Sequence, residues 1–140
     1  MSIRTLKILH VEDEDSQRRL VSHHLQTLDD FHCEVQYADS EEAALGLFES
    51  GEMEFVILDY NLRQGDGLHC LEEMRSRDPI VPIIAISGAA TAEVAADMVQ
   101  AGVDGYISKR ELTSGVLARC MREALERADA CRRRTIGRRP

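Results

Sequence analysis

The chain has 140 residues, 44% of them hydrophobic, which indicates one folded domain with a real core rather than a disordered chain. No apolar run approaches the length of a membrane span, and the N-terminal stretch is not a signal peptide, so we expect a cytoplasmic protein. The net charge of −8 disfavours nucleic-acid binding by the domain itself.

The charge is unevenly distributed along the chain. Residues 131–140 contain five arginines and no acid, which leaves 12 basic and 25 acidic residues, a net charge of −13, in residues 1–130. We therefore expect a domain over residues 5–129 and a basic, flexible tail over residues 130–140. The four cysteines form no C-x-x-C pair, so we expect reduced thiols in or near the core.

The hydrophobic pattern alternates five times between a short apolar strand and an amphipathic helix. The predicted strands cover residues 6–11, 33–38, 55–58, 82–86 and 105–108. The predicted helices begin near Asp15 or Ser16, after Ser40, and near Leu68, Thr91 and Glu111, and the last one ends near Asp129. This order implies an α/β fold with right-handed crossovers and a five-stranded parallel sheet that is covered by helices on both faces.

Polar residues follow the ends of four predicted strands. Glu12 and Asp13 follow the first, Asp59 the third, Ser87 the fourth and Lys109 the fifth. The C-terminal ends of parallel strands meet at one edge of a sheet, so these side chains should lie close together. The carboxylates would raise each other's pKa, and a hard cation such as Mg²⁺ would relieve their repulsion. With the lysine and the hydroxyl, they suit phosphoryl transfer to an aspartate.

Over residues 5–128, the sequence resembles the response-regulator receiver domains of two-component signalling. The resemblance rests on the acidic pair Glu12-Asp13, on Asp59 with Asp66-Gly67 downstream, on Ser87, and on Gly105-Tyr106 followed by Lys109. Each feature alone is weak evidence, but all of them occur in order and at predicted strand ends. The resemblance implies the flavodoxin-like (βα)5 receiver fold with strand order 2-1-3-4-5.

The resemblance also implies a role for each residue of the site. Asp59 would be the phosphoacceptor, and Lys109 would pair with it and then with the phosphoryl oxygens. Asp13, Asp59 and the backbone carbonyl of Asn61 would bind Mg²⁺ directly, with Glu12 helping directly or through water.

A second implied feature is a switch. Ser87 would turn inward to hydrogen-bond the phosphoryl group, and Tyr106 would follow it from an outward to an inward rotamer. The site would thereby be connected to the surface formed by the fourth helix, the fifth strand and the fifth helix.

The sequence departs from the family pattern at three positions. Arg110 follows Lys109, where the family often has a proline with a cis peptide before it, and a cis bond to a non-proline residue is costly. Arg63 stands where proline is common after the acceptor, which predicts a more mobile loop. Glu12 replaces the commoner aspartate. None of these changes removes an essential group, so we expect a working site.

The resulting hypothesis is a stand-alone receiver that catalyses its own phosphorylation and dephosphorylation and acts through protein–protein contacts, as a monomer or weak dimer. Its partners would be a sensor histidine kinase or histidine phosphotransfer protein and a downstream target, in a two-component pathway or phosphorelay. No DNA-binding domain follows in the sequence, which disfavours a transcription factor.

Two other functions are alternatives to this hypothesis. An aspartyl-phosphate phosphohydrolase would need a second acid two residues after Asp59, where the sequence has Asn61, and a cap domain that 140 residues cannot hold. A receiver-like module that binds partners without using phosphate stays open. Its binding would be indifferent to Asp59→Asn.

Overall fold

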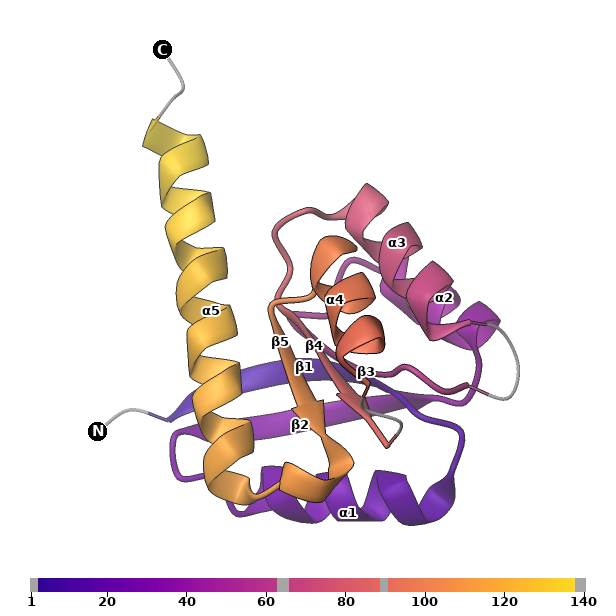
Figure 1. Cartoon of the computed structure of the whole chain (residues 1–140). Coiled ribbons are helices and arrows are strands. Elements are labelled where there is room, and N and C mark those ends of the chain that lie inside the picture. The colour runs from indigo at the N-terminus through magenta and orange to yellow at the C-terminus, as the bar shows by residue number, and fades with distance from the viewer. Residues whose placement is uncertain (1–2, 63–65, 89–90, 138–140) are drawn as a thin grey trace.

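Within the described residues, 3–62, 66–88 and 91–137, the computed structural model shows five parallel strands in the order β2-β1-β3-β4-β5 (Figure 1). The strands are β1 Arg4–Val11, β2 Phe31–Ala38, β3 Phe55–Asp59, β4 Ile83–Ser87 and β5 Gly105–Ser108. The helices are α1 Asp15–Gln26, α2 Glu41–Phe48, α3 Gly67–Arg77, α4 Ala92–Gln100, the short 3-10 helix η1 Lys109–Glu111 and α5 Ser114–Gly137. The predicted α/β fold and strand order are confirmed.

The sheet has an apolar core on each face, because successive side chains of a strand point to opposite sides. In β3, Val56 and Leu58 belong to the core under α2, α3 and α4, while Phe55 and Ile57 belong to the core under α1 and α5. Every residue of β3 and β4 is buried. Burial on both faces explains why these two strands are continuous apolar runs in the sequence.

Side-chain caps fix the starts of three helices. Ser40 accepts a hydrogen bond from the backbone of Ala43 at the start of α2, and Thr91 does the same for α4. The sequence analysis predicted that helices begin after Ser40 and near Thr91. Asp66 caps α3, and the next residue, Gly67, lies against the chain that follows β3. A Cβ there would lie 2.4 Å from the backbone oxygen of Tyr60. Glycine thus lets α3 start directly beside the end of β3.

Several element boundaries differ from the predictions. β1 begins at Arg4 rather than Leu6 and β2 at Phe31 rather than Cys33, because the parallel pairing of the two strands continues past the apolar residues. Every peptide bond of the described residues is trans, which includes the bond between Lys109 and Arg110. The expectation of a mobile loop at Arg63 concerns a position outside the described residues.

The last helix is displaced and longer than predicted. It begins at Ser114 rather than Glu111, after η1, and Thr113 accepts a hydrogen bond from the backbone of Val116. It continues past Asp129 to Gly137, so residues 130–137 are helical where a flexible tail was expected. Arginine and alanine are good helix formers, and Arg132 pairs with Asp129 one turn earlier. No helix in the described part of the chain is both long and apolar enough to cross a membrane.

A partly buried charge network joins the opposite end of the sheet to α3 and α5. Asp104 lies 3.0 Å from a guanidinium nitrogen of Arg75 and 2.6 Å from Nε of Arg127, and it accepts a hydrogen bond from the backbone of Ile83. The side chain of Asp104 is only 9% exposed. Arg75 also donates to the carbonyl of Gly102. The network therefore holds both layers of helices to the starts of β4 and β5.

We expect Asp104→Ala to destabilise the protein by about 3–5 kcal/mol, because it leaves two arginines facing a site without their counter-charge. Urea unfolding measures this change in the free energy of unfolding. The control is Asp30→Ala, which removes an exposed ion pair with Arg122 and should cost at most about 1 kcal/mol. An equal decrease in the free energy of unfolding of the two variants would show that this network stabilises the protein no more than an exposed ion pair does.

Candidate functional site

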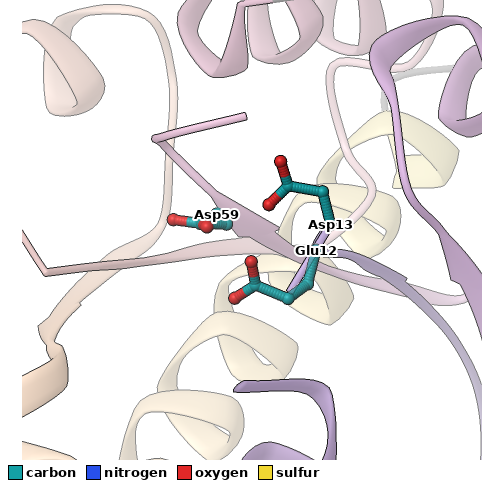
Figure 2. A group of neighbouring side chains, drawn as sticks. All are labelled: Glu12, Asp13 and Asp59. Atoms are coloured by element: carbon teal, nitrogen blue, oxygen red, sulfur yellow. The ribbon is translucent and has the colours of Figure 1, made fainter. Parts of the chain in front are cut away.

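Three acidic side chains meet at the C-terminal edge of the sheet. Glu12 and Asp13 follow β1, and Asp59 is the last residue of the neighbouring strand β3. Figure 2 shows the three carboxylates gathered in one region, and a ligand oxygen from each lies within 4.8 Å of the others. Glu12 and Asp59 are only 2% and 3% exposed, while Asp13 is half-buried. The structure brings together the acids that the sequence predicted to meet.

Lys109 contributes a positive charge to this cluster. It follows β5, and its Nζ lies 3.6 Å from an oxygen of Asp59 and 3.7 Å from an oxygen of Glu12. The aliphatic part of the side chain runs beside Gly88, at the end of β4. One lysine facing three carboxylates leaves an excess of negative charge at a largely buried position.

Glu12 responds most strongly to this crowding. Burial, followed by the hydrogen bond with Asp59 and the negative charge of Asp59, raises the pKa of Glu12 to about 8. The charge of Lys109 opposes the shift without cancelling it. One oxygen of Glu12, Oε2, is buried and has no hydrogen-bond partner among the described residues. In the absence of a cation, Glu12 therefore holds a proton at neutral pH.

The cluster has the chemistry of a site for a hard divalent cation. Carboxylate oxygens are the ligands that Mg²⁺ prefers, and Mg²⁺ usually keeps several waters and uses only one or two protein carboxylates besides. The unpartnered oxygen of Glu12 and the half-buried carboxylate of Asp13 offer such ligands from the same side as Asp59. These three residues can therefore hold Mg²⁺.

The other predicted site residues lie just after β3, at the end of β4 and on β5. Asn61 donates its backbone N–H to Oδ1 of Asp59 at 3.2 Å, so the chain after β3 turns back over this carboxylate. Ser87 is fully buried at the end of β4, one residue beyond the partner of Asp59 in the sheet. Tyr106 is half-buried on β5, and its hydroxyl is buried with no hydrogen-bond partner in the described part of the chain.

His10 is a further buried neighbour of the site. It is buried at the end of β1, and its ring lies 5.7 Å from that of Tyr37. Burial, together with the positive charges of Arg18 and Lys109, lowers its pKa to about 4. The alternation of the strand could have predicted its burial. Leu6, four residues earlier, lies on the same face of β1 and belongs to the core under α1 and α5.

Arg18 was not predicted from the sequence at all. It pairs with Asp15 and donates a hydrogen bond to the backbone carbonyl of Glu12 at 3.3 Å. The contact ties α1 to the end of β1 at the edge of the acidic cluster. No sequence pattern signals it, because the position of the carbonyl depends on the folded backbone.

Comparison with known families matches residues 8–120 to the response regulator receiver domain. The chain belongs to this family. The receiver domain is similar to the chemotaxis protein CheY-3 of Vibrio cholerae, with 32% identity over 108 residues, which are 76% of this chain and 82% of that protein. It is also 28% identical over 126 residues to the chemotaxis protein CheY of Pseudomonas aeruginosa, covering 89% of this chain and 99% of that protein.

Solved structures agree with this assignment. The receiver domain of NtrX from Brucella abortus superposes with a TM-score of 0.75 at 31% identity, and the match covers 85% of this chain and 98% of that one. NtrX from the same organism, in complex with ADP, gives a TM-score of 0.85 at 28% identity. That match covers 97% of this chain but only 30% of NtrX, so only the receiver part of the longer protein is compared.

The raised pKa of Glu12 makes the stability of the metal-free receiver domain depend on pH. The folded value is about 8 against an ordinary value of 4.5, so the folded state keeps a proton that the unfolded state has lost. The stabilisation by Glu12 is fully present below about pH 4.5 and is lost as the pH rises through about 8. Glu12→Gln, which resembles the protonated form, lacks this dependence.

We expect the free energy of unfolding of the wild type to fall relative to Glu12→Gln between about pH 6.5 and 8, measured by urea titration in EDTA. This window lies above the range in which the lowered pKa of His10, about 4, changes stability. Wild-type and variant stabilities that change in parallel across the window would contradict the assignment to Glu12.

Proposed function

We propose that this chain is a phosphorylation-controlled signalling switch. Asp59 accepts a phosphoryl group from the phosphohistidine of a sensor histidine kinase or of a histidine phosphotransfer protein. The observation that carries the proposal is the position of Asp59, buried at a strand end, within 4.8 Å of two further carboxylates and 3.6 Å from Lys109. Membership of the receiver family supports it.

Among the three acids, the surroundings favour Asp59 as the acceptor. Asp59 ends β3, which lies between β1 with Glu12 and β4 with Ser87, and its carboxylate is paired with Lys109. A carboxylate oxygen of Asp59 forms the bond to phosphorus as the phosphorus–nitrogen bond of the phosphohistidine breaks. Asp13, Asp59 and the carbonyl of Asn61, with help from Glu12, would hold Mg²⁺, which would supply positive charge for the phosphoryl oxygens. Lys109 then pairs with the same oxygens.

Ser87 and Tyr106 carry the signal away from Asp59 in this proposal. The hydroxyl of Ser87 donates to a phosphoryl oxygen, a contact that exists only in the modified state, and the buried hydroxyl of Tyr106 follows it. Such a contact can bias a surface with two arrangements. Output is a protein–protein contact on the face made by α4, β5 and α5.

Hydrolysis of the acyl phosphate resets the switch, so the chain catalyses its own phosphorylation and dephosphorylation with one turnover per signal. It is not an enzyme in the usual sense. The four cysteines are free, and reduced thiols fit a cytoplasmic place of action.

One prediction of this proposal concerns the phosphoacceptor. With Mg²⁺ and acetyl phosphate, the wild type should gain one phosphoryl adduct in its intact mass, while Asp59→Asn should gain none. EDTA should abolish the adduct, because the phosphoryl oxygens then lack the cation. Asp97→Asn, a matched change at an exposed position of α4, should label like the wild type.

Absence of the adduct from a wild type that binds Mg²⁺ would favour the alternative, a phosphate-independent binding module. An adduct that survives in Asp59→Asn would place the acceptor elsewhere. Repeated turnover of small phosphate esters would instead favour the other alternative, an aspartyl-phosphate phosphohydrolase.

Another prediction distinguishes the role of Lys109 from that of the metal ligands. Lys109→Ala should bind Mg²⁺ at least as tightly as the wild type, because it removes a competing positive charge 3.6 Å from Asp59. Its labelling by acetyl phosphate should slow by about 100-fold, the typical loss when one preorganised charge is removed from a reacting group. Mg²⁺ titration and timed intact-mass measurements check the two parts. Lys7→Ala, on the exposed side of β1, is the matched control.

A further inference from the structure

One edge of the sheet is formed by β2. All eight of its residues pair with β1, and the described part of the chain offers β2 no second strand (Figure 1). Such an edge exposes backbone N–H and C=O groups with which another strand can pair. Lysine and proline commonly prevent this, and β2 contains neither. The backbone of β2 is therefore open to strand addition.

The side of β2 that faces α1 is apolar and incompletely covered. Alternate residues of the strand point to this side, namely Phe31, Cys33, Val35 and Tyr37. Exposure is greatest at Tyr37, which is 42% exposed. Two hollows of about 430 and 370 Å³ lie between β2 and α1 and share Ser22, Gln26 and Tyr37. They form one continuous depression, the β2 groove, with an apolar floor and a polar wall.

One end of the β2 groove is basic. Arg18, Arg19 and His23 of α1 line it. Arg18 is already paired with Asp15, whereas Arg19 is exposed and has no described ion pair or hydrogen bond within residues 3–62, 66–88 and 91–137. Residues 1–130 have a net charge of −13, so most of the domain surface repels acidic ligands. The groove is a local exception to that repulsion.

We propose that the β2 groove is a docking site for an extended segment of a partner protein. The segment pairs with β2 as a further strand and lays alternate apolar side chains over Val35 and Tyr37. An acidic side chain of the segment pairs with Arg19. The free backbone edge, the half-covered apolar floor and the unpaired arginine are separate observations that favour the same ligand, since backbone pairing supplies affinity and side-chain pockets supply specificity.

The test begins with a random peptide display library, selected on the full immobilised chain. We expect the enriched peptides to alternate apolar and polar residues and to contain aspartate or glutamate. One enriched peptide is then synthesised with a fluorophore, and its dissociation constant is measured by anisotropy for the wild type and for Arg19→Glu. The charge reversal should weaken binding by at least about tenfold, because like charges then face each other.

Controls distinguish this docking mode from general charge attraction. Arg119→Glu makes the same charge change at an exposed position of α5 and should alter binding less than about twofold. Replacing the acid of the peptide by lysine should restore binding to Arg19→Glu. N-methylation of alternate peptide nitrogens should abolish binding, because it removes the hydrogen bonds of strand addition. Tyr37→Ser should weaken binding while the circular dichroism spectrum stays native.

The proposal is overturned if enriched peptides bind Arg19→Glu as tightly as the wild type, or if N-methylated peptides bind unchanged. A library that yields no peptide sensitive to Arg19 or Tyr37 also overturns it. A protein that dimerises through β2 and excludes peptides would identify the occupant as a second copy instead, and would equally refute a partner segment.

Discussion

Repulsion among three carboxylates is the constraint on which the rest of this structure depends. Asp59 and Glu12 are withdrawn from water, and Lys109 neutralises only part of their charge. Such an arrangement is unfavourable for an empty, fully ionised site, and the domain relieves it by leaving a proton on Glu12. The same repulsion favours the binding of a hard divalent cation at this site.

Only a rigid frame can hold the carboxylates at this separation. The frame is the pair β1 and β3, whose parallel register places Val11 opposite Leu58 just before the acids begin. The last four residues of β1 and all of β3 are buried, so any slip of register would move core side chains out of the core. At the far end of the sheet, Asp104 and its two arginines hold the helices in place. The strand register and this charge network together hold the three carboxylates close to one another.

Much of this arrangement was predictable because it follows from local pattern and topology. Apolar runs predicted the strands, and the meeting of strand ends predicted that Glu12, Asp13, Asp59 and Lys109 would lie together. The contacts that were not predicted join residues far apart in the sequence, as between Arg75 and Asp104, or a side chain and a backbone carbonyl, as between Arg18 and Glu12. Their partners are defined only once the backbone is folded, so periodicity and spacing carry no signal for them.

Helix α1 contacts both the end of β1 beside the acidic cluster and the β2 groove. Arg18 donates to the carbonyl of Glu12, and the next residue, Arg19, lines the groove. Tyr37, in the floor of the groove, packs beside the buried ring of His10, two residues before Glu12. A ligand that shifts α1 or Tyr37 therefore acts on the backbone that positions a predicted metal ligand. Thermodynamic linkage makes such an effect reciprocal. If modification of Asp59 changes the affinity for the groove ligand, binding of that ligand changes the free energy of the modification by the same amount.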